Sequence, residues 1–420
     1  MAVFAALLLI LCVFSGILWN YTRLNTLPGP LLAVLSDIWS QCFKLSPGYA
    51  YRLEHLHRKC GEVVRTGPKT VSVSDPSIVF WLDAACPQRS KKSFLDSYVD
   101  EPEEAIVNSR LKSDHRIYLD EQTDDGPQHH DEIKNLVLNF LRAIRKQHTM
   151  KLTVFRNFAT DIVGRMFVGD LGDDRAAPIG TYSRWNDASI VDVLPETGRK
   201  TILQAETREY DGPYDSLIVN GADCVAAAFV SMFRHLFKCP TAMFQLQDEV
   251  DNAFRNLTIS DVLHQETELH ALPFLDAVMK ESMRLAMKFD YRRAVPAGGL
   301  AVLGHYVPER TVVQFHSEAL KNNRTTFGED VSDFRPQRWL QADLDQWQRT
   351  RMEEALLFLR PNIPNSAEAR AAWLELKRAA ALIIWKFDLH PLNYEEVFIQ
   401  DAVSPEQEYE IMVNFTPRMH

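Results

Sequence analysis

The sequence is short of positive charge and has no paired cysteines. Its 420 residues include 46 lysines and arginines against 56 aspartates and glutamates, a formal net charge of −10 at pH 7. Because phosphate binding needs a basic face, nucleic acid is not an expected partner. The cysteine spacings match neither a disulfide framework nor a zinc site, so we expect no metal. The six cysteines are Cys12, Cys42, Cys60, Cys86, Cys224 and Cys239.

The chain also lacks a glycine- or serine-rich linker and any internal repeat. Its first 19 residues hold no charged side chain. At ~1.5 Å per residue such a helical run covers about 30 Å, the thickness of a bilayer's hydrocarbon core. We therefore predict a transmembrane anchor over residues 1–20, a proline-rich hinge over 21–30 and a single large domain over 31–420.

A cleaved signal peptide is the alternative to an anchor. It is disfavoured because no lysine or arginine precedes the apolar run and the run exceeds a usual signal core. The first positive charge, Arg23, follows the run and favours a cytosolic body. The expected location is therefore the endoplasmic reticulum membrane, crossed once, with the lipid bilayer as a partner.

Residues 272–284 have the pattern of a helix with one buried face. Apolar side chains recur at helical spacing, and Pro273 stands in the first turn, where a helix tolerates proline. Glu281 and Arg284 are three residues apart on this helix and can form a charged pair. Taken alone, such a pair is most often a solvated surface contact.

The segments downstream of this helix change that interpretation. Together with the Glu-x-x-Arg helix they resemble the C-terminal half of a fungal microsomal cytochrome P450. The resemblance implies a mainly α fold with small β-sheets, a cytochrome P450-like fold behind an N-terminal transmembrane helix. It also implies that Glu281, Arg284 and Arg338 form the structural triad of that family. The segments are residues 292–299, 302–308, 311–315, 327–330 and 338–339.

Residues 214–237 have the pattern of a long central helix. Within it, Asn220-Gly-Ala-Asp-Cys-Val225 resembles the family's Ala-Gly-x-Asp-Thr-Thr, in which the acid and the hydroxyl deliver protons at the haem. Asp223 keeps the acid, but Cys224 stands at the hydroxyl position and is a poorer hydrogen-bond donor. The resemblance makes both of them candidate catalytic residues. The alternative for Asp223 is a structural role, capping backbone groups inside a bent helix.

No cysteine follows Cys239, although the family binds haem iron through a cysteine thiolate in a loop after the triad arginine. Counting back from Glu375 puts Ser366 at the position of that lost haem ligand. Counting forward from Phe358 gives Asn365 instead. A serine hydroxyl is a weak iron ligand, so we expect no cofactor, with haem as the alternative.

Two histidines could replace the missing thiolate in principle. His316 follows a predicted strand, and His390 follows the last long helix. Neither lies in the loop where the family places its ligand. We therefore expect both to be ordinary surface or hydrogen-bonded histidines.

Three functions are compatible with this pattern. The first is a non-oxidative cyclase or isomerase acting on a hydrophobic polyketide or terpenoid intermediate of fungal secondary metabolism, with Asp223 as the acid and Cys224 beside it as hydrogen-bond partner or nucleophile. The second is a non-catalytic scaffold that binds other biosynthetic enzymes. The third is a haem-dependent monooxygenase hydroxylating such an intermediate. The missing cysteine favours the first, with a hydrophobic small molecule as substrate.

Overall fold

The computed structural model divides the chain into two compact units. Unit 1 comprises Met1–Tyr98, Met287–Asp333 and Asp345–Leu357, and unit 2 comprises Val99–Ala286, Phe334–Leu344 and Phe358–His420. The structure describes residues 15, 21–46, 48–78, 126–168, 227–264, 269, 271–287, 290–341, 344–356, 366–398 and 411–418.

Unit 1 is built on a four-stranded sheet in the order β1-β2-β7-β4. β1 (Val63–Arg65) and β2 (Thr70–Val73) form the antiparallel hairpin that their β-branched residues predict. β2 then pairs in parallel with β7 (Val312–His316), and β7 pairs antiparallel with β4 (Asp290–Ala294). A separate hairpin joins β5 (Leu300–Val302) to β6 (His305–Val307).

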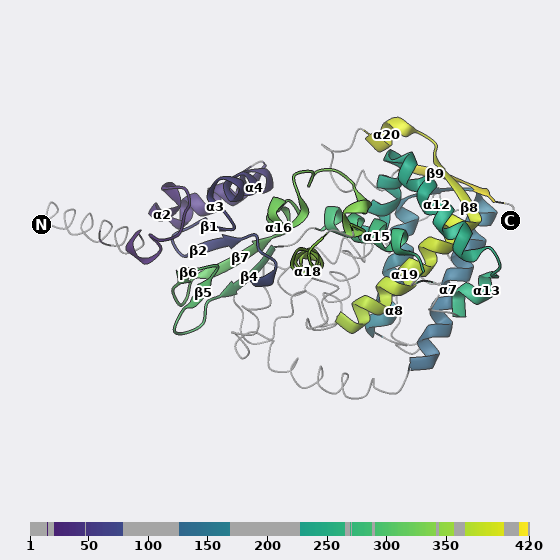
Figure 1. Ribbon diagram of the computed structural model, residues 1–420, viewed down its shortest axis with the longest axis horizontal. Helices are drawn as coiled ribbons and strands as arrows, with labels where there is room; N and C mark the ends of the chain where they lie inside the picture. The colour runs from purple at the N-terminus through teal and green to yellow at the C-terminus, as the bar shows by residue number, and fades with distance from the viewer. Residues whose placement is uncertain are drawn as a thin grey trace, which may run out of the picture. The chain divides into compact units, whose positions relative to one another are not determined.

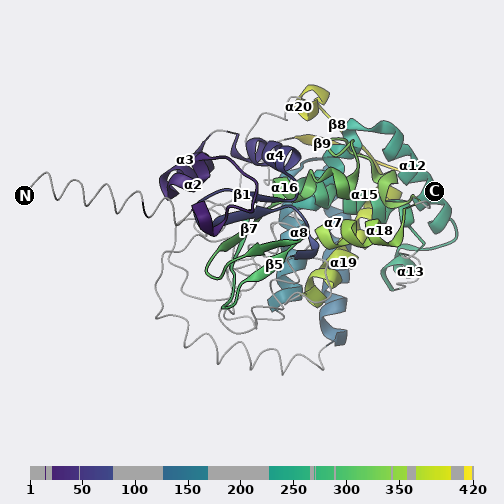
Figure 2. The same ribbon diagram turned by 60° about the vertical axis from the view of Figure 1, so that its left-hand side comes forward.

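The helices of unit 1 are short, and most of them begin at a side-chain cap. Ser36 accepts a hydrogen bond from the Trp39 amide, and Asn323 accepts one from the Thr326 amide. In Figure 2 the longest of these helices, α4, lies beside α16, which it contacts. They are α2 (Leu32–Leu35), α3 (Asp37–Leu45), α4 (Tyr49–Cys60), α16 (Ser317–Lys321), α17 (Arg324–Phe327) and α18 (Gln346–Ala355).

Unit 2 is mainly helical. Figures 1 and 2 show α7, α8 and α19 side by side, and each of the three contacts the other two. Residues 227–238 are also helical and carry the C-terminal end of the predicted central helix. The helices are α7 (Gly126–Gln147), α8 (Thr153–Val168), α12 (Pro240–Phe254), α13 (Ile259–His264), α15 (Pro273–Ala286), the 3-10 helix η4 (Pro336–Trp339), α19 (Ser366–Lys386) and α20 (Tyr394–Phe398).

A three-stranded antiparallel sheet completes unit 2. Its order is β3 (Thr149–Lys151), β9 (Met412–Pro417), β8 (Phe387–Pro391). β8 begins at Phe387, directly after α19. The apolar pattern of α19 continues past this point in the sequence, so the pattern alone would extend the helix. Antiparallel pairing of Leu389 with Phe415 explains why the chain leaves the helix there.

Phenylalanine side chains fill the centre of unit 2. The rings of Phe140 and Phe158 stack with their centroids 4.1 Å apart, and Phe155 contacts Phe233 at 4.7 Å. These residues come from α7, α8 and the helix over residues 227–238, and all are buried. Aromatic pairs in this geometry contribute about 0.5–1.5 kcal/mol each beyond the area they bury.

The predicted mainly α fold with small sheets is confirmed. The predicted anchor lies outside the described residues, apart from Ser15. Among the helices that the structure describes, none combines the length and the apolar character needed to span a bilayer. The hinge and the single large domain stay predictions.

Candidate functional site

The helix that carries Glu281 and Arg284 of the predicted triad, α15, is fixed at its N-terminus by a carboxylate from another helix. The Glu249 side chain on α12 accepts hydrogen bonds from the amides of Phe274 and Leu275, at 2.7 and 2.9 Å. These amides belong to the first turn of α15, where backbone N–H groups have no hydrogen-bond acceptor within the helix. Burial raises the pKa of Glu249, and the two amide hydrogen bonds oppose that shift.

Glu281 on this helix binds two buried guanidinium groups. Arg284 donates to it from Nε (3.1 Å) and Nη2 (2.8 Å), and Arg338 donates from Nε at 2.9 Å. The carboxylate also accepts the Trp339 indole N–H at 2.9 Å and the Arg335 amide at 3.1 Å. The structure thus brings together all three residues of the predicted triad.

This cluster is fully enclosed. Glu281 and Arg284 are 0% exposed and Arg338 is 1% exposed. Burial alone would raise the pKa of Glu281, but the hydrogen bonds and charges of the two arginines outweigh it, so the pKa lies below its usual value. The sequence indicated the arginines by their spacing and order, but it did not reveal the Trp339 indole as a further donor.

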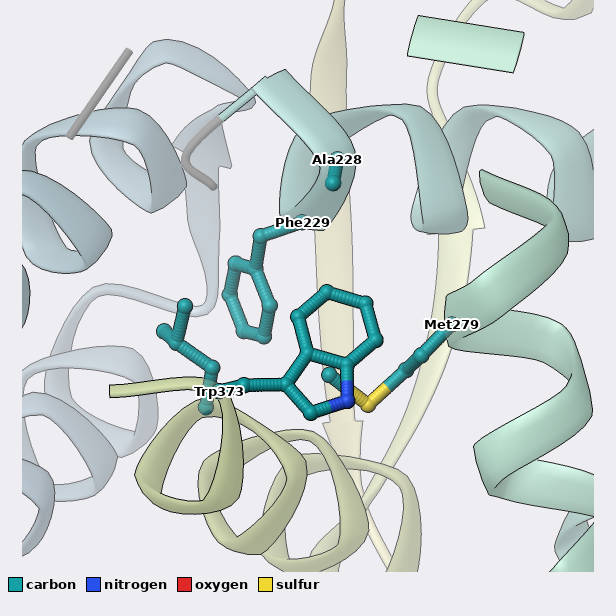
Figure 3. A pocket seen from close by; sticks show the side chains of 5 residues that line it. Ala228, Phe229, Met279 and Trp373 are labelled. Atoms are coloured by element: carbon teal, nitrogen blue, oxygen red, sulfur yellow. The ribbon is translucent and has the colours of Figure 1, made fainter. Parts of the chain in front are cut away.

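A closed apolar crevice lies between α15, α19 and the helix over residues 227–238. Figure 3 shows the Trp373 indole lying between the Phe229 ring and the Met279 sulfur. The crevice has no room for a water molecule. Its lining consists of Ala228, Phe229, Met279, Trp373 and Leu376.

Most of the remaining predicted residues cannot be placed in this arrangement. Asp223 and Cys224 lie outside the described residues, so their proposed roles stay predictions. Ser366 is the first residue of α19, but its side chain is not described. His316 caps α16 by accepting the Glu318 amide at Nδ1, 3.2 Å away, and His390 is exposed on β8.

The chain is similar in sequence to fungal monooxygenases. The family model for cytochrome P450 matches residues 207–353. A cytochrome P450 monooxygenase of Aspergillus flavus is 23% identical over 486 aligned positions, covering 96% of this chain and 95% of that protein. One from Annulohypoxylon moriforme is 23% identical, with 91% and 90% covered, and one from Emericella nidulans is 26% identical, with 76% and 80% covered.

The chain is similar in sequence to the cytochrome P450 family. The family match runs through α15, the strands β4 to β7 and η4, where the sequence resemblance was first seen. The alignment with the A. flavus protein has 486 positions and this chain has 420 residues, so at least 66 positions (486 less 420) face no residue of this chain. Internal segments of the relative therefore have no counterpart here.

The family overturns one prediction made from the sequence. We expected no cofactor, because the ligand cysteine is missing. Members of the cytochrome P450 family depend on haem, and the relatives are named as monooxygenases. The expectation of no cofactor was therefore wrong. The interpretation as a cyclase or isomerase also gains no support from any of these names.

The residues of this chain do not fit a haem held in the way of the cytochrome P450 family. A thiolate ligand is required after the triad arginine, and no cysteine follows Cys239. The described thiols, Cys42, Cys60 and Cys239, all precede the triad in the chain. Among the residues that the structure describes, no group of three histidine, cysteine or acidic side chains could hold a metal ion. The apolar crevice is too closed to admit water.

Proposed function

We propose that this chain is a fungal haem-dependent monooxygenase that hydroxylates a hydrophobic polyketide or terpenoid intermediate. The similarity to the A. flavus monooxygenase carries the proposal, because it extends over 96% of the chain. The buried cluster of Glu281, Arg284 and Arg338 supports it, since the family resemblance assigns these residues to the core that holds the haem loop. The substrate class follows the resemblance to enzymes of fungal secondary metabolism.

The proposed activity requires a thiolate ligand for the haem iron, and the sequence has no cysteine after Cys239. Thiolate ligation pushes electron density toward the iron and favours cleavage of the O–O bond. A monooxygenase with no thiolate in this part of the chain needs another axial ligand, or internal residues that this sequence does not contain. The first measurement is therefore the haem content of the purified protein.

The test has two stages. The full chain, expressed in a fungal host, is purified from membranes and its haem content is measured. The spectrum of the reduced protein is then recorded with and without carbon monoxide. We expect a Soret band that shifts when carbon monoxide binds. A preparation with intact secondary structure and no haem would overturn the proposal.

Product analysis gives the second stage. With a reductase, NADPH and a candidate substrate, a monooxygenase incorporates one oxygen atom from O₂, which ¹⁸O₂ identifies by mass spectrometry. Conversion of the substrate without oxygen incorporation would instead support the cyclase or isomerase.

We further propose that this chain is held in the endoplasmic reticulum membrane by residues 1–20, with its body in the cytosol. The uncharged run over residues 1–19 supports this location. Other biosynthetic enzymes on the same membrane are its proposed partners. Carbonate extraction of microsomes should leave the chain in the membrane, and added protease should digest its body. Release by carbonate would contradict the anchor.

A further inference from the structure

Arg378 on α19 is a fully buried cation in unit 2 whose hydrogen-bond donors are only partly used. Its side chain is 0% exposed, and each of the next six residues, 379–384, is also 0% exposed. Its Nη1 donates to the carboxylate of Glu375, which stands three residues earlier on the same helix. Its Nε and Nη2 meet no hydrogen-bond acceptor among the residues that the structure describes.

These two nitrogens form the edge of a guanidinium that binds a carboxylate. Nε–H and Nη2–H lie side by side in one plane, so together they reach both oxygens of a single carboxylate. Arg284 shows this arrangement in the same unit, because its Nε and Nη2 donate to the two oxygens of Glu281 at 3.1 and 2.8 Å. Arg378 has the same edge, but no carboxylate of the described part of the chain meets it.

Burial makes the unused edge of Arg378 costly. A donor that is taken out of water without gaining an acceptor loses its hydration, and the loss is larger for a charged group. An exposed arginine such as Arg145 on α7 is in contact with solvent, which can accept from its donors. Arg378 is enclosed, so its edge needs an acceptor inside the protein. Buried polar groups in folded proteins almost always have such a partner.

The position of Arg378 on α19 separates it from the apolar crevice. Figure 3 shows Trp373 of the same helix in that crevice. Successive residues of an α-helix are about 100° apart, so Arg378 lies roughly 140° around the helix axis from Trp373. The neighbouring Lys377 is 7% exposed, with its Nζ 3.5 Å from an Asp276 oxygen. This turn of α19 thus carries two buried cations and one buried carboxylate, an excess of positive charge that favours an anion.

We propose that Arg378 binds a small free carboxylate, such as formate or acetate, through Nε and Nη2 in the interior of unit 2. A carboxylate is planar, accepts two parallel hydrogen bonds and brings one negative charge to the turn that holds Lys377 and Arg378. Because Arg378 is 0% exposed, the ligand is a small ion and not the end of a large substrate. This inference is independent of haem and of the proposed oxygenase activity.

Equilibrium unfolding in urea tests the inference, because every unfolding event opens the site to the ion. The purified full chain is unfolded while sodium formate replaces sodium chloride at constant ionic strength. A ligand that binds only the folded protein lowers the unfolding equilibrium constant by the factor 1 + [L]/Kd, and we expect a decrease of at least about tenfold. Equilibrium dialysis of the chain, refolded in ¹⁴C-labelled formate, should find about one bound formate per chain, as a single fork predicts.

Arg378→Lys is the decisive variant, because lysine keeps a positive charge beside Glu375 but has no planar pair of donors. We expect it to lose the bound formate and to reduce the effect of formate on unfolding to less than about twofold. Arg145→Lys is the matched control, the same substitution at an exposed position, and should behave like the wild type.

Two outcomes would overturn the inference. An equal effect of formate on the wild type and both variants would be a general effect of the salt on unfolding. No effect of formate on the wild type, together with no bound formate, would mean that water or a side chain of this protein meets the Arg378 edge. The dialysis of the wild type decides between binding and no binding even if Arg378→Lys fails to fold.

Discussion

At the scale of single residues, Glu281 is the acceptor at the centre of the buried charged cluster of unit 2. It accepts hydrogen bonds from three side chains and one amide, and the two arginine contacts are buried. We expect Glu281→Gln to destabilise the protein by about 3–5 kcal/mol, because it leaves Arg284 and Arg338 buried without their counter-charge. Urea unfolding followed by circular dichroism measures the change in the free energy of unfolding.

The matched control for this substitution is Glu329→Gln. Glu329 pairs with Arg324, but its side chain is 82% exposed. An exposed pair of this kind contributes about 0–1 kcal/mol, so the control should unfold almost like the wild type. Equal effects of the two substitutions would show that burial adds nothing to the Glu281 cluster.

His57 predicts a pH dependence in unit 1. Its ring is buried on α4, with Nδ1 3.1 Å from the Gly61 carbonyl and Nε2 2.8 Å from the Ser72 hydroxyl. A neutral ring satisfies both contacts if Nδ1–H donates to Gly61 and Nε2 accepts from Ser72. Burial, with a smaller contribution from the His316 charge, lowers the pKa of His57 from 6.5 to about 4, although the Gly61 hydrogen bond opposes this.

The sign of the effect follows from proton uptake. Between pH 6.5 and about 4 the unfolded chain binds a proton at His57 that the folded protein does not bind, so stability falls as the pH falls. We expect His57→Gln to reduce the slope of unfolding free energy against pH in that window by about 1.4 kcal/mol per pH unit. His55→Gln, exposed on the same helix, is the control and should keep the wild-type slope. An unchanged slope in His57→Gln would contradict the prediction.

What the sequence could predict at this scale depended on local spacing. Glu281 and Arg284 are three residues apart on a helix, so their contact follows from helical geometry. Their complete burial does not, because spacing alone cannot distinguish a core pair from a surface pair. The contact with Trp339 joins residues 58 positions apart and needed the tertiary fold.

At the scale of elements, Gly29 tests the packing of the segment before α2. A Cβ atom added there would lie 2.4 Å from the Arg65 carbonyl oxygen, a backbone atom that cannot easily move. We therefore expect Gly29→Ala to break the contact between Pro28 and β1 and to expose Leu24 and Leu27. Limited proteolysis should cut residues 24–30 at least about tenfold faster, since a shift of 1.4 kcal/mol in a local opening equilibrium is tenfold.

The control is Asn25→Ala, in the same segment but exposed. It should leave the cleavage rate unchanged. Slow cleavage in both variants would mean that the segment tolerates the added methyl group by shifting as a whole.

Local sequence patterns predicted the elements whose stabilising contacts join residues close together in the sequence. The β1–β2 hairpin and α15 follow from β-branched residues, a Gly67-Pro68 turn and helical periodicity. The parallel pairing of β2 with β7 joins residues more than 240 positions apart, such as Val71 and Val313, and no local signal encodes it. The end of α19 at Lys386 could not be predicted from local sequence either. It depends on the pairing of the next segment, β8, with the distant strand β9.

At the scale of the whole molecule, the family was predictable from the order of its segments, whereas the chemistry was not. The resemblance rested on several short patterns in sequence, and the family match covers the same region. The missing cysteine led to the wrong expectation of no cofactor. The missing cysteine concerns ligation at one position, whereas the similarity to the A. flavus monooxygenase extends along 96% of the chain.

The same comparison predicts that Ser366→Cys alone will not produce the thiolate-type spectrum of the family. The loop before Ser366 reads Arg360-Pro-Asn-Ile-Pro-Asn365, so it also lacks the family's glycines, which let the backbone approach the porphyrin closely. At least 66 aligned positions of the A. flavus relative have no counterpart here, so more than one side chain separates the two proteins. We expect reduced Ser366→Cys to give the same carbon monoxide spectrum as the wild type.

The informative comparison is a variant in which residues 359–368 are replaced by the family pattern Phe-x-x-Gly-x-Arg-x-Cys-x-Gly, which places the cysteine at position 366. If the loop alone limits ligation, this variant gains the red-shifted carbon monoxide band and Ser366→Cys does not, because only the longer replacement restores both sulfur and close backbone approach. A full thiolate band in Ser366→Cys would contradict the prediction. It would show that the rest of the haem pocket is already formed around Ser366 and needs only the ligand.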